Sequence, residues 1–195
     1  GGTTTLTGAF RFQQDINTLR SSPCAGVGLG GGGGSGNTLF WTIPATHDTV
    51  LSNTSTFDNR TRVVEVCKTS TSPFNGKKVI QLDVPLKKVG SPTTPNISAK
   101  IWSSAGEVKY TSPTTIDPST LTTSFVKQTF DFSTNTHIMV PGNRIGVEWI
   151  TSSDTNYIEV GYENGSVSES SVYANYESGA WEEKGSRDMA IDVWE

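Results

Sequence analysis

The sequence predicts an all-β fold, a jelly-roll β-sandwich of two antiparallel sheets with about eight to ten strands. Three observations favour this fold class. Short segments alternate apolar and polar residues, which is the pattern of strands that bury one face and expose the other. Turn-forming residues separate these segments. No long helical pattern and no internal repeat is evident, which excludes the fold classes that are built on helices.

The N-terminal part carries one predicted strand and a glycine-rich segment. Residues 6–12 alternate apolar and polar positions and predict a strand, and residues 13–22 allow at most a helical turn. Residues 26–36 (GVGLGGGGGSG) contain eight glycines but lack the βαβ context of a dinucleotide-binding motif and the Lys-Ser/Thr ending of a P-loop. We interpret them as a flexible loop or linker. The alternative is a glycine-lined surface that another backbone can approach closely because no side chains project from it.

The strands that follow are predicted from the same alternation. Residues 79–89 (VIQLDVPLKKV) place Ile80, Leu82, Val84 and Leu86 on one face. Other strands are predicted at residues 38–43, 62–68, 96–102, near Phe125, 143–151, near Asn156 and 188–194. Residues 152–155 should join two strands as a hairpin, and residues 173–183 should form a loop-rich stretch. The expected core comprises Ile80, Leu82, Val84, Ile97, Ile101, Ile145, Val147, Val160, Met189 and Ile191.

The composition limits the possible partners. The net charge is −4, the pI is about 5.2, and no basic stripe is visible, which argues against nucleic-acid binding. No apolar run is long enough to span a bilayer. The chain has 27 Thr and 23 Ser with few Lys and Glu, which is typical of secreted β-proteins. We therefore expect an extracellular or cell-surface location. The initial Gly1 suggests a processed polypeptide, with an expression scar as the alternative.

Two covalent modifications are predicted. The only two cysteines, Cys24 and Cys67, suggest a disulfide in an oxidising compartment. Closing that long loop would stabilise the fold by about 3–4 kcal/mol, and two unrelated buried thiols are the alternative. Four Asn-X-Ser/Thr sequons are potential glycosylation sites, of which Asn96 is the weakest because it begins a strand. The four asparagines are Asn53, Asn59, Asn96 and Asn164.

The C-terminal 120 residues resemble a known family. The segments that carry the resemblance are LDVPLKKVGSPT (82–93), SAKIWSSAGEV (98–108), IDPSTLTTSFVKQTFDFS (116–133), RIGVEWITSSDTNYIEVGYENG (144–165) and YANYESGAWEEKGSRDMAIDVW (173–194). Over residues 79–194 the chain resembles a jelly-roll module of secreted prokaryotic surface proteins and of phage tail or receptor-binding proteins, which is similar in shape to carbohydrate-binding modules. The resemblance implies a β-sandwich and an extracellular location. It implies no single function, because such folds host many.

The residues that carry chemistry in enzymes are not arranged as catalytic motifs. His47 and His137 lie far apart in different contexts, and no GxSxG motif is present. Glu148 alternates with apolar neighbours and should point outward into solvent, and Glu182 and Glu183 should lie in a loop. We therefore expect a protein without enzymatic activity.

The sequence offers candidate residues for two kinds of ligand, a metal ion and a glycan. If an ion is bound, we expect a structural Ca²⁺, because this ion prefers oxygen ligands. Asp188 and Asp192 are the candidate ligands, and Asp58 and Asp154 are also available. The alternative is that these are ordinary surface aspartates. A glycan could stack on exposed aromatic rings. The glycan-binding candidates are Trp102, which faces away from Ile97 and Ile101, and the clustered Tyr173, Tyr176 and Trp181. The alternative is that other segments cover these faces.

The N-terminal strand suggests assembly. An extended segment with Leu6, Phe10 and Phe12 on it can complete the open sheet of a neighbouring subunit, as in donor-strand complementation. Pairing within its own chain is the alternative. The expected function is a non-enzymatic, structural or adhesive subunit of an extracellular fibre, coat or appendage that associates with itself. A carbohydrate-binding module and a phage tail or virion decoration domain are the alternatives.

Overall fold

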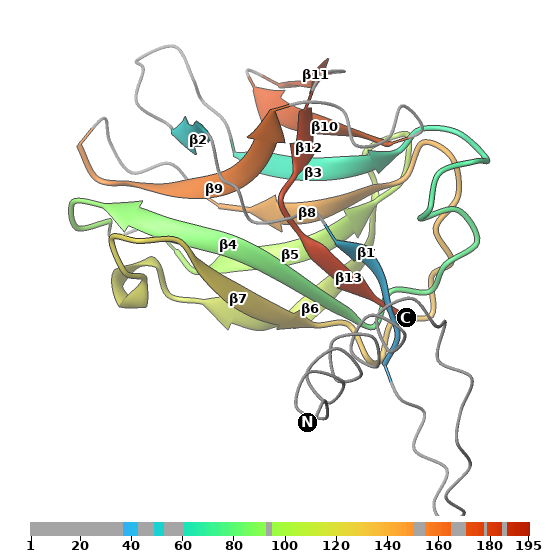
Figure 1. Ribbon diagram of the computed structural model, residues 1–195, viewed down its shortest axis with the longest axis horizontal. Coiled ribbons are helices and arrows are strands. Elements are labelled where there is room, and N and C mark those ends of the chain that lie inside the picture. The colour runs from blue at the N-terminus through green and yellow to red at the C-terminus, as the bar shows by residue number, and fades with distance from the viewer. Residues whose placement is uncertain are drawn as a thin grey trace, which may run out of the picture. The chain divides into compact units, whose positions relative to one another are not determined.

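The structure, a computed structural model, describes residues 37–42, 49–52, 61–92, 95–149, 155–164, 171–177, 179–184 and 187–195. The chain divides into two units, Gly1–Gly36 and Asn37–Glu195, and every described residue belongs to the second. This second unit is all-β and consists of two antiparallel sheets (Figure 1), which confirms the predicted fold class. Its described helical content is a single 3₁₀ turn, η1, Pro118–Thr120.

Each sheet is built from strands that are distant in sequence. Sheet A comprises β1 (Leu39–Thr42), β2 (Thr49–Ser52), β4 (Gln81–Val89), β7 (Val126–Asp131), β9 (Tyr157–Asn164), β12 (Arg187–Met189) and β13 (Asp192–Trp194). Sheet B has the order β11-β10-β3-β8-β5-β6, with β3 (Arg62–Cys67), β5 (Ile97–Trp102), β6 (Val108–Ile116), β8 (Arg144–Glu148), β10 (Ser171–Glu177) and β11 (Ala180–Lys184).

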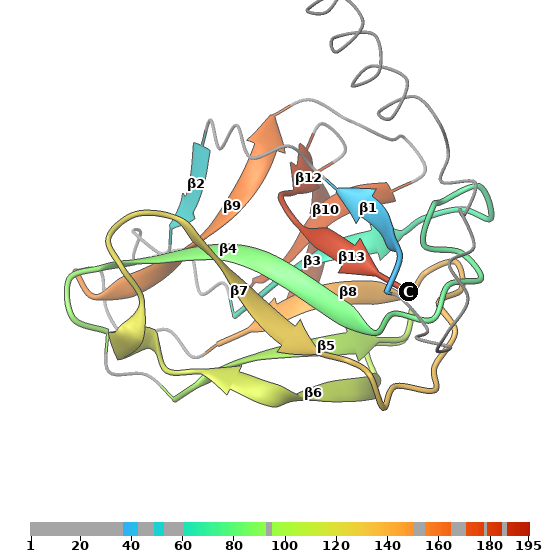
Figure 2. The ribbon, with the colours of Figure 1, turned by 60° about the horizontal axis from the view of Figure 1, so that its bottom comes forward.

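The strand order is that of a jelly roll. Four strands of sheet A lie in the order β1-β13-β4-β7, and four of sheet B in the order β3-β8-β5-β6. Figure 2 shows β4 and β7 lying over β5 and β6. The chain crosses from one sheet to the other between β3 and β4, between β4 and β5, and between β6 and β7. Side chains of the two inner faces therefore share one core.

Strand β4 is central to sheet A and contains a proline that the pairing accommodates. On one side β4 pairs with β7 over Gln81–Leu86; on the other it pairs first with β13 over Gln81–Asp83 and then with β9 over Leu86–Val89. Pro85 pairs with Lys127 of β7 and lies between the β13 and β9 segments, so on that side of β4 it is not part of a ladder.

The predicted core is confirmed with one exception. Nine of its ten residues are at most 2% exposed, but Ile80 is only half-buried and Val79 is buried instead. Strand β4 begins at Gln81, so Ile80 lies before the regular alternation. The Ile80 N–H donates to the Trp194 carbonyl (2.9 Å), and the Ile80 carbonyl accepts from the Phe132 N–H (2.8 Å).

Three predictions of local structure are wrong. Strands β8 and β9, predicted to form a hairpin through residues 152–155, lie in different sheets. Residues 173–183 are not loop-rich, because β10 and β11 form a hairpin with Gly179 at φ 89° in its turn. The single strand predicted at 188–194 is two strands, since a tight turn from the Ile191 N–H to the Met189 carbonyl (2.9 Å) separates β12 from β13.

Truncation of the core gives a first testable prediction. Val147 and Ile191 are fully buried in the same hydrophobic cluster, so Val147→Ala or Ile191→Ala should lower the free energy of unfolding by about 2–4 kcal/mol. Urea denaturation measures this loss. The exposed Val108, at 50% exposure, supplies the control, because Val108→Ala should change stability by less than about 0.5 kcal/mol. Equal losses in core and control variants would contradict the assigned core.

Candidate functional site

Among the described strands, β1 is an end of sheet A and pairs with β13. The Thr38 N–H donates to the Glu195 carbonyl (2.8 Å), and the Glu195 N–H donates to the Thr38 carbonyl (2.9 Å). Because residues alternate in direction along an antiparallel ladder, the next residue, Leu39, which pairs with Trp194, should turn its N–H and carbonyl away from β13. The regular register ends there, since it shifts between Leu39 and Trp41. The Leu39 side chain is 39% exposed. This edge therefore offers backbone hydrogen-bonding groups to an additional strand.

The two end strands of sheet B, β6 and β11, carry features that oppose strand addition. Strand β6 contains Lys109 and Pro113, and β11 ends in Glu182, Glu183 and Lys184. Charges and prolines of this kind block edge-to-edge pairing. Neither β1 (LFWT) nor β2 (TVLS) contains a charged residue or a proline.

Strand β7 is protected by the neighbouring edge of the other sheet. The Ser112 hydroxyl of β6 donates to the Asp131 carbonyl (2.8 Å), and the Asp131 N–H donates to the Thr114 hydroxyl (3.3 Å). Side chains of one sheet thereby satisfy backbone groups at the edge of the other. Within the described part of the chain, β1 is therefore a more accessible edge than the Asp131 end of β7.

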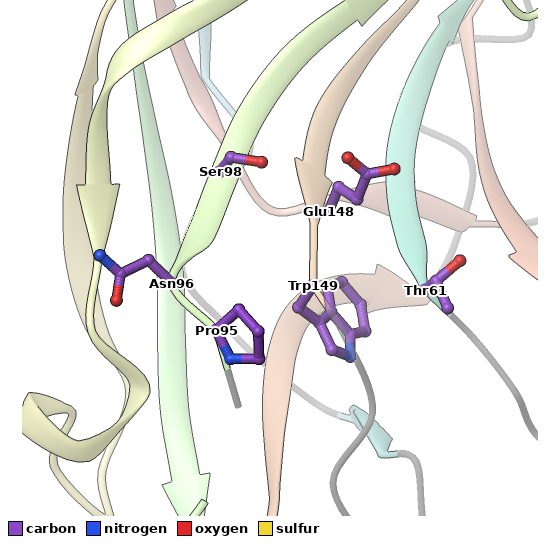
Figure 3. Close-up of a pocket in the computed structure, with 6 residues that line it drawn as sticks. All are labelled: Thr61, Pro95, Asn96, Ser98, Glu148 and Trp149. Atoms are coloured by element: carbon purple, nitrogen blue, oxygen red, sulfur yellow. The ribbon is translucent and has the colours of Figure 1, made fainter. Parts of the chain in front are cut away.

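A pocket of about 420 Å³ lies at one end of sheet B (Figure 3). It is formed where β5 begins, where β8 ends and just before β3 begins, because Ser98 and Arg62 both pair with Glu148 in the sheet. Its lining residues are Thr61, Pro95, Asn96, Ser98, Glu148 and Trp149. The pocket therefore combines a carboxylate, hydroxyl and amide groups with two apolar rings.

Among the described residues that line the pocket, Glu148 carries the charge, and it is held by two cations. The Arg62 Nε donates to Glu148 Oε1 (2.7 Å), and the Lys100 ammonium pairs with Oε2. Partial burial raises the pKa of Glu148, but the hydrogen bonds and charges of Lys100 and Arg62 outweigh it and hold the pKa below 4.5. Glu148 is thus ionised at neutral pH and fixed in position. The prediction that Glu148 points outward into solvent is wrong in part, because its side chain is only about one-fifth exposed.

Trp102 is on the predicted face but is not an exposed platform. It is 0% exposed, because it packs with Val64, Val66 and Ala174 in a second hydrophobic cluster on the outer side of sheet B. Trp181 covers it edge-on, with the ring centroids 5.9 Å apart. A sugar cannot stack on Trp102 in this arrangement, so this part of the glycan prediction is wrong.

The other aromatic candidates have different outcomes. Trp181 is half-buried, with the Arg144 guanidinium 5.0 Å and the Arg62 guanidinium 5.9 Å from its ring centroid. Tyr176 pairs with Trp181 along the β10–β11 ladder. The side chains of Tyr173 and Tyr176 are outside the described part of the structure, so their role stays a prediction.

Two carboxyl groups that the sequence did not single out as a pair meet inside the sandwich. Glu65 of β3 and Asp188 of β12 are both 0% exposed, and the Met189 N–H donates to Glu65 Oε2 (2.9 Å). Burial, followed by the charge of Asp188, raises the pKa of Glu65 well above 4.5, and the Met189 bond opposes this. A proton on one carboxyl group supplies the hydrogen bond that two carboxylates could not form.

The predicted calcium ligands have separate surroundings. Asp188 faces Glu65 in the interior, whereas Asp192 accepts from the Thr42 hydroxyl (2.7 Å) and pairs with the Lys127 ammonium. Within the described ranges, no group of three or more His, Cys, Asp or Glu side chains is placed to hold a metal ion. The structure therefore does not bring Asp188 and Asp192 to a common oxygen site.

The predicted modification sites are only partly described. Asn96 is exposed, and its amide donates to the Thr115 hydroxyl (3.0 Å); Asn164 ends β9, and its side chain is outside the described part. Cys67 is buried, with its Sγ 3.9 Å from the Thr69 carbonyl oxygen, and it has no disulfide partner among the described residues. Cys24, its partner in the predicted disulfide, lies outside them. The disulfide stays a prediction.

The remaining residues singled out in the sequence are mostly outside the described ranges. His137 is described, and its Nε2 lies 2.7 Å from Asn143 Oδ1 in the turn before β8. No helix in the described ranges is long and apolar enough to cross a membrane. Residues outside the described ranges are Leu6, Phe10, Phe12, His47, Asn53, Asp58, Asn59 and Asp154.

Comparison with known proteins adds no relative on which to base a function. No protein-family model, no curated protein and no solved structure matches this chain.

Proposed function

We propose that this chain is a non-enzymatic structural or adhesive subunit of an extracellular assembly, in which subunits are joined by strand addition. The open β1 edge carries the proposal, because Leu39 turns its backbone groups away from β13 on a strand without charge or proline. The composition, rich in Thr and Ser, supports the extracellular location.

The donor is the N-terminal segment of a second copy. Residues 6–12 alternate Leu6, Gly8, Phe10 and Phe12 with other residues, so one face is suited to an apolar groove. Residues 13–36 lie between this segment and the sandwich, and 24 extended residues reach up to about 80 Å. That length is enough to reach a neighbouring subunit, and backbone hydrogen bonds would supply much of the affinity.

A proline at position 39 tests the edge directly. Leu39→Pro removes the N–H group that faces away from β13, while the Thr38–Glu195 pair keeps both of its hydrogen bonds. The variant should remain folded by circular dichroism yet fail to assemble in negative-stain microscopy and light scattering. Leu39→Thr, which keeps the N–H group, should assemble as the parent does.

Deletion of residues 1–12 tests the donor. The shortened chain should be a folded monomer, and the free peptide of residues 1–12 should raise its melting temperature without restoring polymers. Assembly of the deletion variant, or of Leu39→Pro, at the parent's rate would contradict strand addition at β1. A parent protein that stays monomeric under all conditions would contradict the subunit role itself.

A further inference from the structure

We propose that the pocket between β3, β5 and β8 binds one sugar unit of a neutral saccharide. The inference is independent of the assembly role. The residues that line the pocket support it, together with Arg62 and Lys100, which pair with Glu148. The pocket's volume, about 420 Å³, is within the usual range of small-molecule sites, roughly 300–1,000 Å³.

The charges around the pocket argue against an ionic ligand. Glu148 is held between Arg62 and Lys100, so an anion would have to compete with this carboxylate for the two cations. A cation that approached the remaining lone pairs of Glu148 would be repelled by the charges of Arg62 and Lys100. A neutral ligand meets neither obstacle.

The hydrogen-bonding groups suit hydroxyls. A carboxylate offers about four lone-pair sites, and Arg62 and Lys100 occupy one on each oxygen of Glu148. The remaining sites can accept from ligand O–H groups. Ser98 and Thr61 supply hydroxyls that both donate and accept, and Asn96 adds an amide, so one ligand would find donors and acceptors around it.

The apolar part of the lining suits the C–H face of a sugar ring. Figure 3 shows the rings of Pro95 and Trp149 among the lining side chains, below the Glu148 carboxylate. Trp149 is only 5% exposed, so the core holds its ring in place and only a small part of the ring is available to a ligand. A rigid apolar wall beside a fixed acceptor is pre-organised for a ring that has one apolar face and several hydroxyls.

Titration with neutral methyl glycosides tests the proposal. The full chain is produced in a host without N-glycosylation, because Asn96 lines the pocket and a sugar attached to it would obscure the result. Amide NMR spectra are recorded against a panel of methyl hexosides and methyl pentosides, up to about ten times the dissociation constant expected for one sugar, which is on the order of 1 mM. Saturable shifts should appear at Ser98, Glu148 and Trp149 with at least one glycoside.

Variants of the pocket residues distinguish binding in this pocket from nonspecific effects of the glycoside on the protein. Ser98→Ala keeps both ion pairs of Glu148 and should weaken binding about three- to tenfold, and Glu148→Gln should weaken it at least about tenfold. Glu107→Gln is the matched control, because Glu107 also pairs with a lysine but does not line the pocket, and binding should be unchanged. The methyl glucuronide should bind more weakly than the methyl glucoside.

Three results would overturn the proposal: no saturable shift with any glycoside, shifts that both pocket variants leave unchanged, or tighter binding of the glucuronide. The last would show that the pocket selects an anion. None of these results bears on assembly through β1, because the pocket residues and Leu39 lie in different sheets.

Discussion

We expect the Gly146→Ala substitution to lower the free energy of unfolding by more than about 4 kcal/mol relative to the parent protein, an unusually large cost for one methyl group. Gly146 lies in the middle of β8, between Val64 of β3 and Lys100 of β5. A Cβ atom at this position would overlap the Val63 carbonyl oxygen and lie 2.6 Å from the Val64 Cα. Both are backbone atoms, so β3 and β8 would have to separate at the centre of sheet B.

Urea denaturation of Gly146→Ala beside Gly76→Ala measures this cost. Gly76 has φ 79°, but no atom lies within 4 Å of the place that an added Cβ would take, so its alanine variant carries only the left-handed backbone penalty of about 1–2 kcal/mol. The difference between the two variants isolates the overlap of β8 with β3. A Gly146→Ala variant as stable as Gly76→Ala would mean that the two strands separate at little cost.

The second large effect should be on the pH dependence of stability. Because the folded pKa of Glu65 lies well above 4.5, the folded protein binds more protons than the unfolded chain between these two values. The stabilisation is fully present below about pH 4.5 and is lost as the pH rises through the folded pKa. For one proton the slope is at most about 1.4 kcal/mol per pH unit.

Glu65→Gln should remove this slope. The amide oxygen can still accept from the Met189 N–H, and the amide N–H₂ can donate to Asp188, so the site keeps its hydrogen bonds without titrating. The variant should resemble the parent near pH 4 and exceed it in stability at higher pH. Thermal unfolding between pH 4 and pH 9 measures both curves, with Glu107→Gln as a control at an exposed carboxylate.

Parallel curves of stability against pH for the parent and Glu65→Gln would show that the Glu65–Asp188 pair is not protonated in the folded state.

Below pH 4, groups whose pKa is lowered in the folded state change the stability in the opposite direction. Hydrogen bonding to Ser119 and to Ser133 lowers the pKa values of Asp117 and Asp131, so their contributions are lost as the pH falls. Because both curves contain these groups, their difference reports Glu65.

The alternation in the sequence predicted most strand faces because it records how each strand divides core from surface. It placed Leu82, Ile101, Ile145 and Val147 inside, and all four are fully buried. The same pattern could not say what covers the outer face. Trp102 is on the predicted side, yet Trp181, far along the chain, lies against it. Exposure of an outward residue depends on segments that alternation does not connect.

Glu65 shows a second limit of what a local sequence pattern can predict. In RVVEVC it shares a face with Val63 and Cys67, which predicts burial, whereas its charge predicts exposure. The conflict is resolved by burial and by Asp188, much later in the chain, which together raise the pKa of Glu65. The predicted hairpin at residues 152–155 failed for a related reason, since a short turn-like segment can also connect strands of different sheets. Long-range partners of this kind leave no mark in a local pattern.

The central position of β4 has a consequence for the nascent chain. Its partners β9 and β13 begin roughly 70 and 100 residues after β4 ends, so a ribosome adding about 5–20 residues per second takes several seconds to about 20 s to supply them. During that interval Leu82, Val84 and Leu86 have no completed sheet to enter. Folding dominated by such distant pairings proceeds in milliseconds to seconds. Synthesis, rather than the folding step, should therefore set how long this strand is vulnerable to aggregation.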